Sequence, residues 1–164
     1  ATSAGLNQEQ RKQLSEGINV ELENGNVLRA SQFRGPTRPA TSIVVSGDTA
    51  EQSIQTTSRV TVLVHEATFL NDASDKASEH LHSTASGAAR TALQCNAEHL
   101  ILTHFSARIR DAEEAVSEAK EVLSEANGLA SANDGDRVRI DDDGAVSMLK
   151  RTDSGWTQHN LSHH

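Results

Sequence analysis

The sequence predicts an α/β fold, because short apolar runs typical of buried strands alternate with helical patterns from residue 42 onward. Residues 42–46, 60–64 and 99–103 are rich in Val, Ile and Leu, and each run ends in a polar group. Hairpin patterns near both ends of the chain add antiparallel strands. These observations favour a mixed sheet covered by helices on one side over a helical bundle or a β-sandwich.

The N-terminal part begins with polar, turn-prone residues, 1–11, and continues with a hairpin pattern. Residues 18–23 alternate apolar and polar side chains, as a half-buried strand does. Asn-Gly-Asn at 24–26 supplies a tight turn, so residues 27–30 can pair back on the first strand. Residues 35–39, Gly-Pro-Thr-Arg-Pro, break any regular element and predict a loop.

The segment between the second and third apolar runs contains a predicted loop and a predicted helix. Residues 70–81 are polar and indicate the loop, whereas residues 84–96 carry alanines and Leu93 on one helical face. Ser83 or Thr84 can cap the first amides of this helix.

A second helix follows the third apolar run. Its apolar stripe extends from Ala112 to Ala126, and Asp111 with Glu114 offers a cap-like start. Gly128 is placed to end this helix, and residues 131–135 predict a loop.

The C-terminal residues predict a hairpin and then a loose tail. Residues 138–140 and 145–149 pair across Asp-Asp-Asp-Gly, and residues 152–164 carry no further pattern. A chain of 164 residues fits one domain, which we assign to residues 1–150, followed by a polar tail at 151–164.

Composition limits the classes of function. The formal net charge of −8 argues against a uniformly basic nucleic-acid surface, although Arg29, Arg34, Arg38, Arg108 and Arg110 can form small basic patches. Three Phe, one Trp and no Tyr leave little aromatic surface for stacking on bases. The single cysteine excludes an internal disulfide and suits a reducing compartment such as the cytoplasm. No apolar run has the roughly 18 residues that a membrane span needs.

Asp48 and His104 each follow a predicted strand and are candidate metal ligands. Asp48 lies in a Gly-Asp-Thr turn, where a carboxylate can hold or bridge divalent ions; an Asp that only stabilises the turn is the alternative. His104 carries an imidazole of the kind that binds zinc, and a structural histidine is the alternative.

His82 and Glu66 are candidates for proton transfer. The helix start at Ser83 and Thr84 favours an anion such as a phosphate, so His82 is placed to protonate a leaving oxygen. Glu66 can orient His82 through a ring nitrogen. The alternatives are that Ser83 only caps the helix and that Glu66 only satisfies backbone amides. His65 should point to the opposite face and have a structural role.

Four motifs, in this order, give the sequence a family resemblance. Ser-Gly-Asp-Thr at 46–49, His-Glu-Ala-Thr-Phe at 65–69, His-Ser-Thr at 82–84 and Leu-Thr-His-Phe-Ser at 102–106 resemble the C-terminal half of ribonuclease Z. That family comprises tRNA 3′-processing endonucleases of the metallo-β-lactamase superfamily. The resemblance implies a metallo-β-lactamase-like αββα sandwich, of which this chain supplies mainly the C-terminal half.

The resemblance also implies roles for individual residues. Asp48 would bridge two zinc ions, and His104 would be a ligand of the second ion. His82 and Glu66 would assist protonation of the leaving ribose oxygen. A substrate contact is implied for Arg108, whereas the hydroxyls of Ser83 and Thr84 are expected to meet a substrate phosphate because they lie at the helix start.

As a function, the resemblance implies a zinc-dependent endoribonuclease that removes 3′ trailers from tRNA precursors and acts as a cytoplasmic homodimer. The alternative is a non-catalytic half-domain that acts in association or RNA docking. A third interpretation, hydrolysis of a small ester by the same fold, fits His-Glu-Ala-Thr with His-Ser-Thr less well.

The sequence departs from the family pattern at two points. Leu81 stands where the family has Gly before His-Ser-Thr, which predicts an altered turn. The family's main zinc-binding motif, His-x-His-x-Asp-His, does not occur in the sequence. We therefore interpret the chain as a partial or diverged form, which alone would expose the sheet face that packs on the other half.

Overall fold

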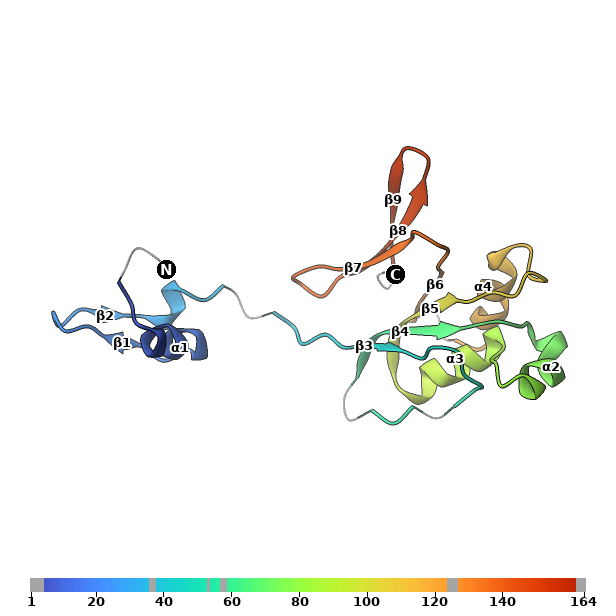
Figure 1. Ribbon diagram of the computed structural model, residues 1–164, viewed down its shortest axis with the longest axis horizontal. Helices are drawn as coiled ribbons and strands as arrows, with labels where there is room; N and C mark the ends of the chain where they lie inside the picture. Colours follow the sequence, from blue (N-terminus) through green and yellow to red (C-terminus); the bar gives the residue numbers. More distant parts are fainter. Residues whose placement is uncertain (1–4, 36–37, 53, 57–58, 124–126, 162–164) are drawn as a thin grey trace. The chain divides into compact units, whose positions relative to one another are not determined.

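The chain contains two compact units, Ala1–Arg38 and Pro39–His164, and is shown in Figure 1. The computed structural model describes residues 5–35, 38–52, 54–56, 59–123 and 127–161. The sequence pattern indicated one domain over residues 1–150. The first unit buries a small cluster of its own, made by Leu6, Leu14, Val20 and Ala30, and the assignment of one domain stays a prediction.

The first unit consists of a short helix and a hairpin. Its elements are α1 (Gln8–Glu16), β1 (Val20–Glu21), β2 (Val27–Leu28) and the 3-10 helix η2 (Ala30–Gln32). The antiparallel hairpin is confirmed, but helix α1 replaces part of the turn-prone segment expected at 1–11. Asn7 and Gln10 form a capping box at 2.8 and 3.0 Å, and this local hydrogen bonding starts a helix that lacks an apolar stripe.

The second unit is built on a four-stranded parallel sheet with the order β3-β4-β5-β6. Its strands are β3 (Ile43–Val45), β4 (Val60–Glu66), β5 (Ala97–Thr103) and β6 (Gly128–Ser131). The first three confirm the predicted strands. Strand β6 was not predicted, because Gly128 was assigned to the end of a helix and four residues carry too weak a pattern.

Helices α3 (Ala85–Gln94) and α4 (Ala112–Lys120) pack on one face of this sheet. Both were predicted; residues 124–126 of the second expected helix lie outside the described part of the chain. The expected loop at 70–81 instead contains the 3-10 helix η3 (Asn71–Ala73) and helix α2 (Ser74–Glu79). The core between helices and sheet includes Leu63, Ala88, Ala92, Leu100, Leu102 and Ala115.

Helices α3 and α4 are joined by one carboxylate. Glu118 accepts hydrogen bonds from the backbone N–H and hydroxyl of Ser86 at 2.8 and 2.9 Å, and from the N–H of Asn71 at 2.7 Å. A side chain of α4 thus satisfies an amide in the first turn of α3, which has no partner within its own helix. Among the helices that the structure describes, none is long and apolar enough to cross a membrane.

The C-terminal residues form a separate antiparallel sheet with the order β7-β8-β9. Its strands are β7 (Arg137–Ile140), β8 (Val146–Thr152) and β9 (Gly155–Asn160). The predicted terminal hairpin is confirmed as β7 and β8. Strand β9 lies where the sequence indicated a loose tail, and the parallel and antiparallel strands form two sheets rather than one mixed sheet.

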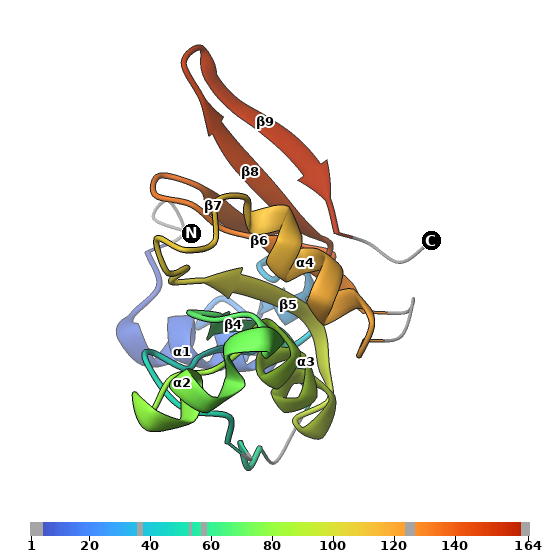
Figure 2. The same ribbon diagram turned by 90° about the vertical axis from the view of Figure 1, so that its right-hand side faces the viewer.

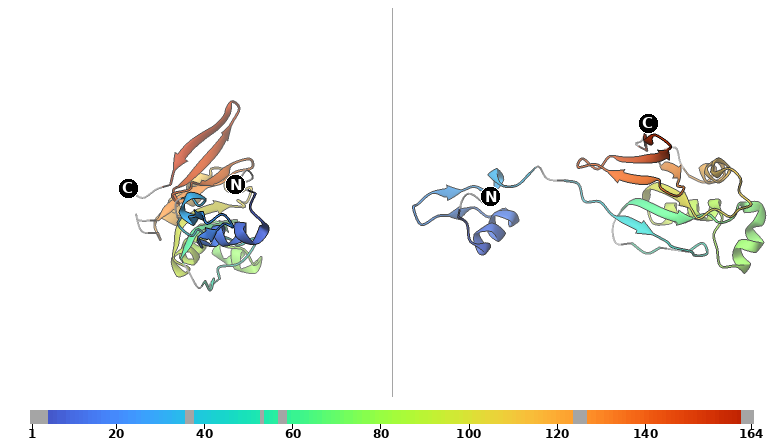
Figure 3. Two further views of the ribbon diagram at one scale, coloured as in Figure 1. Left: turned by 90° about the vertical axis from the view of Figure 1, so that its left-hand side faces the viewer. Right: turned by 45° about the horizontal axis from the view of Figure 1, so that its top comes forward.

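The antiparallel sheet covers part of the parallel sheet on the face opposite the helices. Val146 and Met148 of β8 form a buried cluster with Val62 and Ile101, and Figures 2 and 3 show the two sheets as separate layers. The sheet face that we expected to be exposed is therefore partly buried. Exposed apolar side chains remain on strand β3, where Ile43 and Val45 are 58% and 68% exposed.

Packing between the two sheets predicts unequal effects of neighbouring substitutions in β8. Met148→Ala should lower the free energy of unfolding by about 2–5 kcal/mol, since it leaves a cavity between the sheets. Leu149→Ala, the matched control, should have a smaller effect, because Leu149 points to the other face and is partly exposed. Urea unfolding followed by circular dichroism measures both, and equal losses would contradict this packing.

Candidate functional site

The segment that follows β4 brings three of the sequence motifs together. Residues 67–69 bond on one side to the segment that ends β5, and on the other side to the segment that precedes α3. The backbone hydrogen bonds are Ala67 N to Thr103 O at 2.8 Å, Ser106 N to Thr68 O at 3.1 Å, Phe69 N to Ser83 O at 3.2 Å and Ala85 N to Phe69 O at 3.0 Å. Side chains from the three motifs therefore converge at one end of the sheet.

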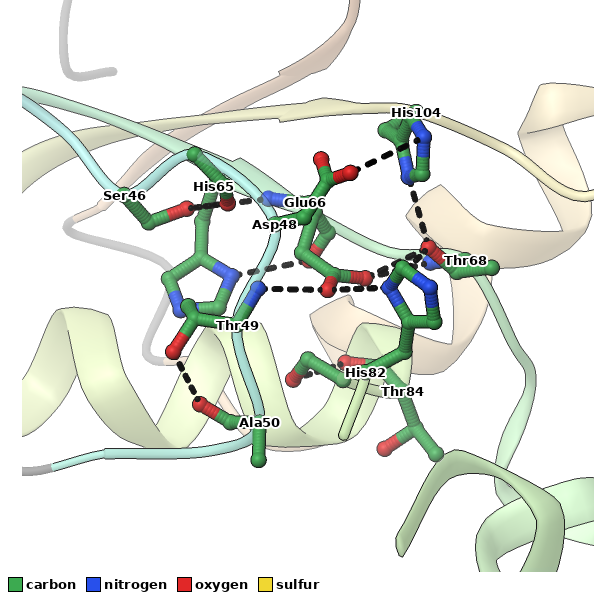
Figure 4. Close-up of polar contacts among 12 residues, drawn as sticks. Ser46, Asp48, Thr49, Ala50, His65, Glu66, Thr68, His82, Thr84 and His104 are labelled. Carbon is green, nitrogen blue, oxygen red and sulfur yellow. Dashed lines mark hydrogen bonds and ion pairs between the residues drawn. The ribbon is translucent and has the colours of Figure 1, made fainter. Parts of the chain in front are cut away.

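The carboxylate of Glu66 lies at the centre of this convergence (Figure 4). Glu66 is 1% exposed. Its Oε1 accepts from the backbone N–H of Thr49 at 2.8 Å and lies 2.7 Å from Nδ1 of His82. Its Oε2 accepts from the N–H and the hydroxyl of Thr68 at 3.1 and 2.6 Å. The expected contact between Glu66 and His82 is present, and so are the backbone amides of the alternative interpretation.

These hydrogen bonds set the charge of Glu66. Burial by itself raises the pKa of the carboxyl, but hydrogen bonds from Thr68, His82, Thr49 and Ser83 outweigh it, and the resulting pKa is below its ordinary value. Glu66 is therefore ionised at neutral pH. An ionised carboxylate accepts but does not donate, so the proton between Glu66 and His82 belongs to Nδ1 of His82.

Thr68 fixes the tautomer of His104. The single hydroxyl hydrogen of Thr68 is directed to the Glu66 carboxylate, the shorter and charge-assisted contact. The Thr68 oxygen, 2.8 Å from Nδ1 of His104, must then accept a hydrogen from that nitrogen. In the neutral ring this leaves the lone pair on Nε2, which faces Oδ2 of Asp48 at 3.6 Å.

Asp48 and His104 fit the chemistry of a zinc site. They offer one carboxylate oxygen and one unprotonated imidazole nitrogen, and both side chains are open to solvent at 64% and 48% exposure. Their 3.6 Å separation is close to the edge of about 3.4 Å in a tetrahedron with metal–ligand bonds of about 2.1 Å. His104 also has a left-handed backbone, φ 56°, a conformation that is costly outside glycine and common at functional sites.

A second grouping, of Glu66, His82 and His104, has ligand atoms within 4.8 Å of one another and could also hold an ion. Hydrogen bonds already engage both Glu66 oxygens and Nδ1 of each histidine. We therefore favour the pair of Asp48 and His104 as the metal-binding residues. The other two members of the second grouping, Glu66 and His82, belong to the hydrogen-bonded network that orients His104.

His82 is held with one ring nitrogen free for chemistry. Its side chain is 24% exposed, its Nδ1 is committed to Glu66, and its ring stacks on that of His104 with centroids 5.4 Å apart. Nε2 is therefore the atom through which His82 can exchange a proton with a bound molecule.

Leu81 explains how His82 is positioned. Helix α2 ends in a Schellman motif, in which the N–H of Leu81 bonds to Ser78 O at 3.3 Å and the N–H of His82 bonds to Ala77 O at 2.9 Å. This motif requires a left-handed residue, and Leu81 adopts φ 58° with its side chain 72% exposed. Leu81 thus adopts a conformation that glycine takes without a Cβ clash, and whether the turn differs from that of the family stays a prediction.

The remaining candidate residues differ in their burial and in their hydrogen-bond partners. Ser83 and Thr84 are 1% and 6% exposed; Thr84 caps α3 by accepting from Gly87 N at 3.0 Å, and the Ser83 hydroxyl donates to Thr84 O. Both hydroxyls thus have structural partners, and their contact with substrate stays a prediction.

Arg108 is exposed on the turn after His104, and its substrate contact is also untested. His65 is fully buried, with Nδ1 2.8 Å from Glu66 O.

Thr68 is the site residue that sequence reasoning missed. A hydroxyl two residues after a carboxylate at a strand end was the available signal, because alternate residues of an extended chain lie on one side. Its link to His104 depends on the pairing of two segments that are 36 residues apart.

Comparisons with known proteins agree with the motifs. No family model matches the sequence. The chain is 43% identical over 122 residues to ribonuclease Z of Bacillus thuringiensis (strain Al Hakam) and to that of Bacillus anthracis. Each match covers 73% of this chain and 38% of the relative, so the chain spans well under half of their length. The resemblance stated from the motifs is confirmed.

A solved structure gives the same answer for the fold. A metallo-β-lactamase fold protein from Bacillus subtilis superposes with a TM-score of 0.50 and 25% sequence identity, covering 57% of this chain and 38% of that one. The predicted metallo-β-lactamase-like α/β fold is confirmed.

The network predicts that Glu66→Gln lowers the free energy of unfolding at pH 7 by about 2–4 kcal/mol, because charge-assisted hydrogen bonds are lost at a buried position. A carboxyl whose pKa is lowered by folding stabilises the protein above its unfolded pKa, and this contribution disappears as the pH falls through the folded pKa. The difference between wild type and variant should therefore shrink in acid.

Urea titrations at neutral and acidic pH measure that difference. Glu98→Gln is the control, since Glu98 pairs with the exposed Arg59 and exposed pairs contribute less than about 1 kcal/mol. A difference for Glu66→Gln that does not change with pH would contradict an ionised Glu66.

The left-handed conformation of Leu81 predicts that Leu81→Gly raises the free energy of unfolding by roughly 1 kcal/mol, because glycine adopts positive φ without a Cβ clash. Leu93→Gly, at an exposed position inside helix α3, should lower it by about 1 kcal/mol. Thermal unfolding compares the two, and the same sign for both would refute strain at Leu81.

Proposed function

We propose that this chain, whose sequence resembles ribonuclease Z over 73% of its length, carries the proton-donating side and part of the metal centre of an endoribonuclease. The proposed reaction is hydrolysis of the phosphodiester bond that joins a 3′ trailer to a tRNA precursor. The observation that carries the proposal is the hydrogen-bonded network of Glu66, Thr68, His82, His104 and Asp48.

In this proposal His82 is the general acid. Glu66 holds the ring through Nδ1 at 2.7 Å, so that Nε2 presents a proton to the oxygen of the departing ribose. General acid catalysis of this kind contributes about 10²- to 10⁴-fold to a rate.

Asp48 and His104 are the proposed ligands for zinc, with Thr68 orienting His104. Zinc, when bound, would supply Lewis acidity toward the phosphate and lower the pKa of a bound water. A catalytic zinc site takes about three protein ligands per ion, so these two residues form only part of the centre. The family's His-x-His-x-Asp-His motif, which this sequence does not contain, would supply the rest.

The absence of that motif from the sequence favours a second candidate function. A half-domain without a complete zinc centre would serve in association or RNA docking rather than in cleavage. Zinc analysis of the 164-residue chain tests this second candidate, because two tightly held ions would contradict it. Precursor tRNA as substrate, a homodimer and a cytoplasmic location belong to the first proposal.

The general-acid role predicts that His82→Ala slows cleavage of a 3′-extended tRNA transcript by the native protein by about 10²- to 10⁴-fold. Zinc content should be retained, because His82 is not a proposed ligand. His80→Ala is the control, since His80 is exposed and stacks on Phe69 outside the network. Unchanged cleavage by His82→Ala would remove the assigned role, whereas loss of zinc would reassign His82 to the metal.

A further inference from the structure

The antiparallel sheet has two chemically different faces. Residues opposite each other in its register point to the same side, and Val138, Ile140, Val146 and Met148 share the side that packs on the parallel sheet. The outward positions of the three strands contain no Asp or Glu. They are Arg137, Arg139, Ser147, Leu149, Arg151, Trp156, Gln158 and Asn160, of which Ser147 is buried.

Trp156, the single tryptophan of the chain, is held in place on this outward face. The guanidinium of Arg137 lies 3.9 Å from the centre of its ring, and the indole N–H donates to Gly135 O at 3.1 Å. The side chain is nevertheless 47% exposed. A large aromatic ring that is both fixed and accessible can receive another flat ring with little loss of entropy.

Arg151 extends the positive charge beside Trp156. It lies directly opposite Trp156 in the register of β8 and β9, and its side chain passes over the backbone of Gly135, where an added Cβ would come within 2.5 Å of Arg151 Cδ. Neither Arg137 nor Arg151 forms an ion pair with another described side chain. The adjacent Asp136 is already paired with Lys150 at 3.3 Å.

Two unpaired guanidinium groups around an accessible indole match one kind of partner. The guanidinium groups can bind phosphates, and the face of the indole ring can stack on an unpaired base. Proteins that bind single-stranded nucleic acid use this combination. An acidic peptide would use the charges but not the ring. The concentration of cations on one face is distinctive because the chain as a whole has a net charge of −8.

We propose that the outward face of the β7-β8-β9 sheet binds single-stranded RNA, with one base stacked on Trp156 and phosphates on Arg137 and Arg151. The choice of RNA rests on the proposed function, whereas the stacking platform rests on the contacts of these three side chains. This contact would be a second attachment point for the RNA, separate from the network around Glu66.

Because the chain has one Trp and no Tyr, its fluorescence reports on this face directly. Titration of the 164-residue chain with a short oligouridylate should quench the fluorescence saturably. Arg137→Ala and Arg151→Ala should each weaken binding and reduce the salt dependence by about 0.7 in the log–log slope. Arg11→Ala, which removes the same charge from exposed α1, should leave the affinity unchanged.

Fluorescence anisotropy of labelled RNA extends the test to Trp156 itself. Trp156→Ala should weaken binding by about 10-fold, the value of one stacked base, whereas Trp156→Phe should retain most of the affinity. Circular dichroism verifies that each variant is folded. No quenching, equal quenching by duplex RNA or by polyglutamate, or an equal effect of Arg11→Ala would each overturn the proposal.

The same titration with His82→Ala, compared with a cleavage assay of the native protein, separates this inference from the proposed function. RNA binding at Trp156 that persists while the native protein cleaves no tRNA precursor would support the binding face and contradict the endoribonuclease. Cleavage by the native protein without quenching at Trp156 would overturn only the binding face.

Discussion

The buried carboxylate of Glu66 is the interaction on which the rest of the site depends. It is ionised at a position that is 1% exposed, which is unfavourable unless every lone pair has a partner. Its partners come from three separate segments: Thr49 from the turn after β3, Thr68 from the segment after β4, and His82 from the end of α2. One charge thus joins three motifs and sets the proton positions on their side chains.

The surrounding fold supplies the support that this charge requires. Strands β4 and β5 are the central pair of the parallel sheet, with helices on one face and the antiparallel sheet on part of the other. Two left-handed residues, Leu81 and His104, stand directly beside the network. Such conformations cost of order 1–3 kcal/mol each and persist where neighbouring contacts hold them, and here they place the two imidazole rings 5.4 Å apart.

The sequence predicted the elements whose signal is local. The strands at 42–46, 60–64 and 99–103 were recognised because an apolar run bounded by polar groups is sufficient to identify them. Helix α1 was missed because its capping box acts without an apolar stripe, and strand β9 because its residues are polar and exposed. The division into two sheets was not predictable, since which strands pair depends on contacts distant in sequence.

For the site, the motifs indicated which residues take part but not which hydrogen bonds join them. The motifs predicted the contact between Glu66 and His82. The hydrogen bond between Thr68 and His104 depends on the register between β4 and β5 and was not predicted. The motifs resemble those of ribonuclease Z, a resemblance that the sequence comparisons confirm, and the structure adds the order of hydrogen bonds from Glu66 through Thr68 to His104.

That order of hydrogen bonds determines which ring nitrogen of each histidine carries the proton, and the position of the proton can be measured. Long-range nitrogen–proton NMR spectra of the chain labelled with ¹⁵N-histidine distinguish the two neutral tautomers of each ring. We predict that neutral His82 and neutral His104 both carry the proton on Nδ1, with the lone pair on Nε2. A proton on Nε2 of either ring would contradict the network centred on Glu66.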